Sequence, residues 1–158
     1  MQMDTTRFGR LEIDPDTVIT LTQPIIGFQD YRRFVLLPGP ENSPLSWLQS
    51  TESDELAFLL MDPRRLIQDY DVHLNQHDFA ELALSSENDL EIYTLVVVPD
   101  DPTQVRTNLK APVLINIKQR LGKQTVLEKS DYPIQFFLAQ AKTPADESAE
   151  VANARTDA

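Results

Sequence analysis

The chain of 158 residues is long enough for one domain with a substantial core, and 41% of its residues are hydrophobic. Its 25 acidic and 14 basic side chains leave a formal net charge of -11, and so acidic a surface repels phosphate backbones, which argues against direct binding of nucleic acid. The absence of cysteine excludes disulfides, thiol nucleophiles and cysteine-ligated zinc, and no apolar run reaches the roughly 18 residues that a membrane-spanning helix needs.

Short apolar runs between turn-forming residues predict strands in the first half of the chain. The 11 prolines and 4 glycines divide these runs, a distribution typical of β-rich domains. The run LAFLLM is continuously apolar, as in a strand buried on both faces. We therefore expect strands within residues 7–13, 18–21, 34–37, 45–49 and 56–61, with one helical turn at the start of GFQDYRRFVLL.

A further strand and the only clear helix follow in the middle of the chain. Tyr70, Val72 and Leu74 alternate with polar residues and predict a half-buried strand. Asn75 is a good N-cap, so we expect a short α-helix that ends at Leu82 and turns its apolar side chains inward. We expect no other α-helix.

Residues 90–98 (LEIYTLVVV) carry the clearest strand pattern in the sequence. A hairpin is predicted after it, with an outgoing strand over residues 113–119 and a returning strand over residues 123–128, joined by a turn at the Leu-Gly dipeptide. By strand alternation Val113, Ile115 and Ile117 face the core, which places the residues between them on a partly open face.

The same hairpin is the most basic part of this acidic chain. Residues 106–123 hold five basic side chains and no acidic one. Two interpretations stay open: the basic side chains neutralise acidic loops nearby, or they form a docking face for a polar or acidic partner.

Together these elements predict a mainly β fold. We expect a small antiparallel β-barrel-like domain over residues 1–138, with one short α-helix, because strands at short intervals with turns between them are typical of barrels. Residues 139–158 are rich in alanine and acidic side chains and contain no aromatic residue. They cannot bury enough apolar area to offset their loss of entropy, so we predict a mobile tail.

The sequence carries no motif for catalysis or for a cofactor. Its scattered glycines form no G-x-S-x-G elbow, P-loop or dinucleotide fingerprint. His73 and His77 are four residues apart but fall on different predicted elements, so we interpret them as solvated surface residues and not as metal ligands. We expect no enzymatic activity, no cofactor and no metal. The first ten residues lack the apolar segment of a signal peptide, which favours a cytoplasmic protein.

Six segments in this order resemble the family of bacterial flagellar assembly factors called FliW: TRFGRLEI, GFQDYRRFVLL, SPLSWLQS, LAFLLMDP, VVVPDDP and TNLKAPVLINIKQRLGKQTVLE. The resemblance covers residues 6–132. It implies a non-enzymatic, cytoplasmic, monomeric protein with a β-barrel-like fold. It also implies two protein partners, newly made flagellin and the RNA-binding translational regulator CsrA, whose repression of flagellin translation FliW relieves.

Five residues are predicted to lie near the partner surface, because they are polar or aromatic and their strand faces need not be buried: Trp47, Gln49, Asn108, Asn116 and Arg120. The single tryptophan has a second interpretation as a core anchor. We also expect the acidic surface to attract a basic regulator over long range.

Two other functions are weighed against this one. A small-ligand-binding β-barrel would hold an apolar molecule at its mouth. A hydrolase would use the aspartate-rich loops.

Overall fold

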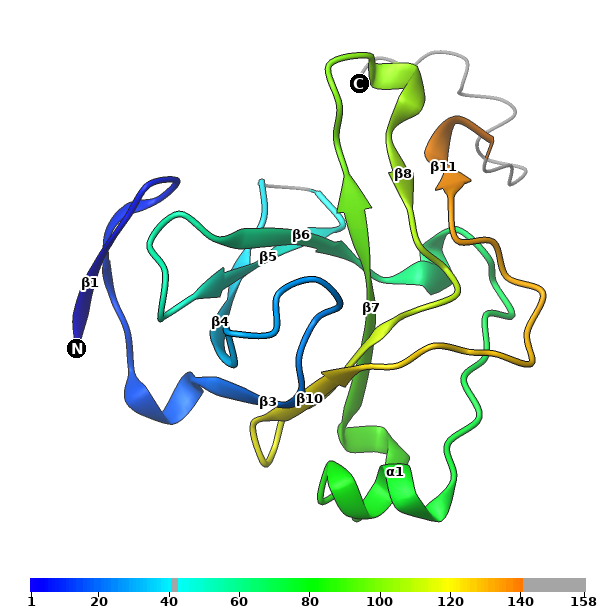
Figure 1. The fold of residues 1–158 in the computed structure, drawn as a ribbon, viewed down its shortest axis with the longest axis horizontal. Coiled ribbons are helices and arrows are strands. Elements are labelled where there is room, and N and C mark those ends of the chain that lie inside the picture. The colour runs from blue at the N-terminus through cyan, green and yellow to red at the C-terminus, as the bar shows by residue number, and fades with distance from the viewer. Residues whose placement is uncertain (41–42, 141–158) are drawn as a thin grey trace.

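Seven strands close on one another to form a barrel in the computed structural model, which describes residues 1–40 and 43–140 (Figure 1). Residues 141–158, most of the predicted tail, lie outside the described residues. In order around the barrel the strands are β3 (Ile19–Gln23), β4 (Arg33–Pro38), β5 (Leu45–Ser50), β6 (Ala57–Met61), β7 (Leu90–Val97), β9 (Val113–Asn116) and β10 (Leu121–Gln124).

The prediction of a mainly β, barrel-like domain is confirmed, with one correction to its topology. Every ladder of the barrel is antiparallel except the one between β3 and β10, which is parallel. Neighbouring strands can alternate in direction all the way round only when their number is even. A closed barrel of seven strands must therefore contain at least one parallel pair, and it is mixed instead of wholly antiparallel.

Four short strands lie outside the barrel, and three of them fall where the sequence predicted none. The N-terminal hairpin pairs β1 (Gln2–Thr5) with β2 (Gly9–Glu12) as a separate two-stranded sheet. At the other end of the molecule β8 (Arg106–Thr107) pairs with the C-terminal half of β7, and β11 (Phe136–Phe137) pairs with β8 (Figure 1). Strands of two residues are too short to show an alternating pattern.

Short 3-10 helices lie between the strands. Three of them begin at an Asp-Pro dipeptide, where the aspartate side chain accepts a hydrogen bond from a backbone N–H and proline occupies the first position of the turn. Within residues 1–40 and 43–140 they are η1 (Pro15–Thr17), η2 (Pro63–Arg65), η3 (Glu87–Asp89), η4 (Pro102–Gln104) and η5 (Leu138–Gln140).

The predicted α-helix is confirmed as α1 (Gln76–Glu81). Asn75 caps it: its side chain accepts from the N–H of Asp78, and the Asp78 carboxylate accepts from the N–H of Asn75. Leu82, at the C-terminal end, is fully buried. No helix among the described residues is long and apolar enough to cross a membrane.

Two apolar clusters hold the fold together. The first fills the barrel with side chains that are 0–2% exposed: Ile19, Leu21, Ile25, Phe34, Leu48, Leu60, Val113 and Ile115. The second lies beneath α1 and its flanking loops, around Tyr70, Leu82, Leu84, Ile92, Leu109 and Leu114. Because consecutive residues of β9 contribute to different clusters, this strand is buried on both faces. The predicted open face at Leu114 and Asn116 is therefore wrong.

Two other local predictions are wrong. Residues 70–74 form no strand, since no neighbouring strand pairs with them, although their burial alternates as a strand's does. The hairpin turn lies at residues 117–120, so Leu121 and Gly122 belong to the returning strand. Arg120, at φ 60°, takes the left-handed conformation within this turn.

Candidate partner-binding surface

Trp47 lies half-buried on β5 beneath the turn of the N-terminal hairpin. Phe8 meets its ring edge-on, with centroids 5.7 Å apart, and the guanidinium carbon of Arg7 is 4.4 Å from the ring centroid. The N–H of Thr6 also donates to the carbonyl of Asp54. Trp47 therefore attaches the separate β1–β2 sheet to the barrel, which gives this residue a structural role.

Arg7→Gln is expected to lower the free energy of unfolding by about 0.5–1 kcal/mol, because it removes the cation–π contact with Trp47. It should also change the emission of the chain's only tryptophan in the folded state. Urea unfolding followed by fluorescence measures both effects. Arg10→Gln is the control, since the Arg10–Asp4 pair lies in solvent and contributes little. Equal losses in the two variants would show that the contact with the ring is not what matters.

Gln49 and Asn116 are buried, with exposures of 0% and 1%. The Gln49 amide nitrogen donates to the carbonyls of Ser50 and Ser53, at 3.0 and 3.3 Å, and so holds the turn after β5. The sequence-based expectation that their strand faces need not be buried is thus wrong for both residues.

Asn116 uses its whole side chain inside the protein. Its nitrogen donates to the carbonyls of Leu82 and Ala83, at 2.8 and 3.2 Å, beyond the end of α1. Its oxygen accepts from the N–H groups of Lys118 and Gln119, at 3.0 and 3.2 Å, within the hairpin turn. One buried amide therefore joins the loop after α1 to the β9–β10 turn.

Asn108 and Arg120 are half-buried turn residues. The Asn108 side-chain oxygen accepts from the N–H of Lys110 and of Ala111, which shapes the loop before β9. The Arg120 N–H donates to the Asn116 carbonyl at 2.8 Å, and its own carbonyl accepts from Thr20. Asn116 and Arg120 thus lie together at the hairpin turn, whereas Trp47 and Gln49 lie two residues apart on β5 and Asn108 lies in the loop before β9. Their contact with a partner stays a prediction.

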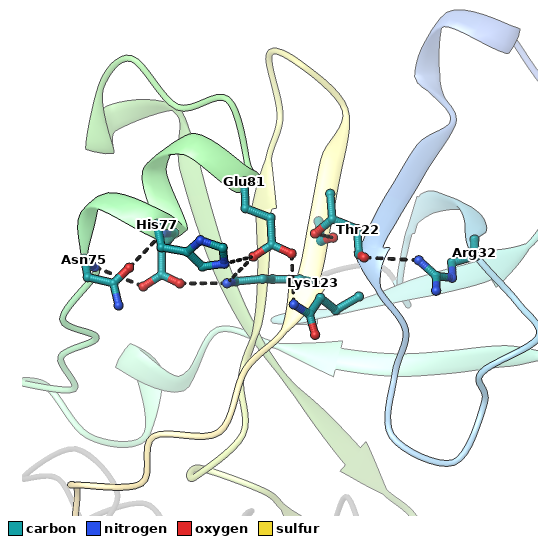
Figure 2. Close-up of polar contacts among 9 residues, drawn as sticks. Thr22, Arg32, Asn75, His77, Glu81 and Lys123 are labelled. Carbon is teal, nitrogen blue, oxygen red and sulfur yellow. Dashed lines mark hydrogen bonds and ion pairs between the residues drawn. The ribbon is translucent and has the colours of Figure 1, made fainter.

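The most highly organised polar group was not singled out from the sequence. Lys123 on β10 extends to α1, where its amine lies 2.7 Å from a carboxylate oxygen of Asp78 and 2.8 Å from one of Glu81 (Figure 2). The lysine side chain is 6% exposed and each carboxylate 15%. Gln23 on β3 donates to the second Glu81 oxygen at 3.0 Å. This lysine–carboxylate cluster joins α1 to both strands of the parallel ladder.

The charges of this cluster stabilise one another. The hydrogen bond from Lys123 is the main cause that lowers the pKa of Glu81 to about 2. Burial by itself would raise the pKa of Asp78, but the hydrogen bonds from Lys123 and from the Asn75 N–H leave that pKa below its usual value. Burial likewise opposes the charge of Lys123, yet its two carboxylate partners raise its pKa. All three groups are therefore charged at neutral pH.

Acid is expected to weaken the fold through these carboxylates. Because the pKa of Glu81 falls from 4.5 to about 2 on folding, the unfolded chain binds more protons in this range, and stability decreases as pH falls from about 4.5 to 2. The loss is on the order of 3 kcal/mol for a shift of this size. Urea unfolding across this pH range measures it. Glu81→Gln should flatten the dependence, whereas Glu87→Gln, at an exposed position, should leave it unchanged.

The two histidines lie on the surface. His73 is paired with Asp71 at 3.1 Å and its side chain is 92% exposed, while His77 lies 3.5 Å from Glu81. No group of three or more potential metal ligands occurs among the described residues.

A groove borders the lysine–carboxylate cluster and is lined by two segments without assigned secondary structure, residues 71–75 and 125–132, together with Asp78. Tyr132 joins the two segments: its ring stacks on Tyr70 with centroids 4.5 Å apart, and its hydroxyl accepts from the N–H of Asp71. No sequence pattern reveals the groove, because its two walls come from segments about 50 residues apart in the chain.

A model of the FliW protein family matches residues 2–138. This chain belongs to the FliW family. Relatives include the flagellar assembly factors FliW of Bdellovibrio bacteriovorus, 37% identical over 135 residues, and of Natranaerobius thermophilus, 40% identical over 133 residues. These alignments cover 85% and 84% of this chain, and 77% and 88% of the relatives.

The fold agrees with this assignment. A crystal structure of the flagellar assembly factor FliW is similar with a TM-score of 0.80 and 30% sequence identity, over 87% of this chain and 96% of that one. The resemblance found in the sequence is confirmed. As a member of the FliW family, the chain is a non-enzymatic flagellar assembly factor with a β-barrel fold.

Proposed function

We propose that this chain binds flagellin and the RNA-binding regulator CsrA in the cytoplasm, as a monomer, and that its binding of CsrA relieves the repression of flagellin translation. The observation that carries the proposal is the match to the FliW family across residues 2–138, which includes the whole barrel. Regulation needs only two competing binding equilibria: flagellin that accumulates occupies the chain, and CsrA is then free to repress.

The net charge of the chain supports a basic second partner. At -11 the chain repels nucleic acid, whereas a protein that binds RNA must present lysine and arginine to phosphate groups. Attraction between the two proteins raises their association rate and weakens with salt. Direct competition for RNA by this chain itself is disfavoured by the same charge.

The small-ligand alternative gains no support from the barrel. Its interior is filled with apolar side chains such as Phe34, Leu48 and Leu60, each 0% exposed, as in a packed core. A ligand-binding barrel of this kind needs an interior cavity in place of such packing.

Titration calorimetry of the purified chain against flagellin and against CsrA tests the proposal. Each partner is expected to bind one copy of the chain, and flagellin is expected to reduce CsrA binding. In a second assay, CsrA bound to the leader of a flagellin transcript should release that RNA when the chain is added. An unrelated acidic protein of similar size is the control for charge alone. Absence of binding to both partners would contradict the proposal.

A further inference from the structure

Residues 71–74 have the burial pattern of a strand, but no strand of the described residues pairs with them. Exposure alternates along Asp71, Val72, His73 and Leu74, from exposed to half-buried, following the fully packed Tyr70. Within the described residues, the backbone N–H and C=O groups of Val72, His73 and Leu74 have no hydrogen-bond partner in the protein. One wall of the groove therefore presents unpaired backbone groups, and an extended peptide binds such groups as an added strand.

The opposite wall continues β10 beyond its last paired residue. The N–H groups of Thr125 and Leu127 donate to the carbonyls of Pro112 and Lys110, which extends the register of the β9–β10 ladder. Val126, between them, is 45% exposed. Five apolar or aromatic residues line the groove, and all but Val126 also pack against the second apolar cluster: Val72, Leu74, Val126, Leu127 and Tyr132.

The charged residues of the groove favour a basic peptide as its ligand. Glu128 and Asp131 are exposed carboxylates with no ion-pair partner among the described residues, and Asp71 pairs only with the exposed His73. Of the residues that the structure describes, Lys129 is the only amine that lines the groove. An occupant with apolar side chains flanked by lysine or arginine would complement both the apolar positions and the excess of carboxylates.

We infer that this groove binds an extended, basic segment of a partner protein as an added strand, and we assign that segment to the RNA-binding regulator. The inference rests on the function proposed above. Of the two partners in that proposal, the regulator is the one that must be rich in lysine and arginine, because it binds phosphate backbones. Flagellin then occupies a different surface.

Reversal of the two unpaired charges tests the assignment. Glu128→Lys with Asp131→Lys should weaken CsrA binding about tenfold or more, since two attractions become repulsions, and should leave flagellin binding within about twofold. The matched control is Glu55→Lys with Asp100→Lys, which makes the same change in net charge at two exposed positions outside the groove. The control should change the affinity for CsrA far less than the groove variant does.

Hydrogen exchange of the unaltered chain gives a second measurement that does not depend on any variant folding. The amides of Val72, His73 and Leu74 should become protected when CsrA binds and should stay unprotected with flagellin. No gain in protection, equal loss of both partners in the groove variant, or equal weakening by the control would each overturn the inference. If the unaltered chain binds CsrA and only the groove measurements fail, the proposed function stands; if it binds neither partner, both proposals fail.

Discussion

Lys123→Met is expected to lower the free energy of unfolding by about 3 kcal/mol or more, the largest effect of any single substitution considered for this chain. The reason is that the amine is the shared partner of Asp78 and Glu81, at 2.7 and 2.8 Å. Its removal leaves two carboxylates, each only 15% exposed, beside one another without the amine that both contact. Methionine keeps most of the volume of the side chain, so the loss is electrostatic and not a cavity. Urea unfolding at neutral pH measures it.

Two further variants identify the cause. Lys118→Met removes an exposed amine 3.8 Å from Asp89 and should change stability by no more than about 0.5 kcal/mol. Lys123→Met combined with Glu81→Gln should recover part of the loss, since one of the unpaired charges is then gone. A combined variant that is less stable than Lys123→Met alone would contradict the electrostatic explanation.

Asn116→Ala is expected to lower the free energy of unfolding by about 2–3 kcal/mol, because it removes one buried and three part-buried hydrogen bonds to backbone groups. The two carbonyls beyond α1 lose their donor, and the two N–H groups of the hairpin turn lose their acceptor. Asn88→Ala is the control, at an exposed position where the side chain makes no hydrogen bond among the described residues. Urea unfolding of both variants measures the difference.

The Asn116 variant also separates two interpretations of this residue. If Asn116 has a purely structural role, as its internal hydrogen bonds indicate, the folded variant should keep its affinity for both proposed partners. Full stability together with loss of partner binding would instead favour the sequence-based interpretation, in which Asn116 lies at the partner surface.

Local signals in the sequence predicted where most of the strands and the helix lie. Which strand faces are buried depends on contacts between distant segments, and the sequence did not predict these. Asn75 marked the start of α1 correctly, because capping depends on residues three apart. Burial of Asn116 depends on α1 and its following loop covering β9, which no pattern within the hairpin reveals. The basic side chains of the hairpin also depend on distant contacts. Lys123 neutralises carboxylates of α1, more than 40 residues away in the chain. The interpretation of the hairpin as a docking face therefore does not apply to Lys123.

The alternation at Tyr70, Val72 and Leu74 is the most informative error. The pattern was detected correctly, but a strand also needs a neighbour, and the described part of the chain provides none. The family resemblance was more reliable than the assignment of site residues. The resemblance depended on six segments taken together. The assignment of each site residue depended on whether a single strand face is covered by the rest of the protein.

The parallel ladder between β3 and β10 has a consequence for synthesis on the ribosome. It joins residues 19–23 to residues 121–124, and the Thr22 hydroxyl donates to the Gly122 carbonyl across 100 positions of the chain. The meander from β3 to β6 emerges long before that parallel ladder can form, and until β10 arrives the outer edge of β3 is open to other nascent chains. Closure of so distant a contact is slow, because the loop entropy is lost before the pairing is gained. The chain thus spends most of its own translation as an open sheet.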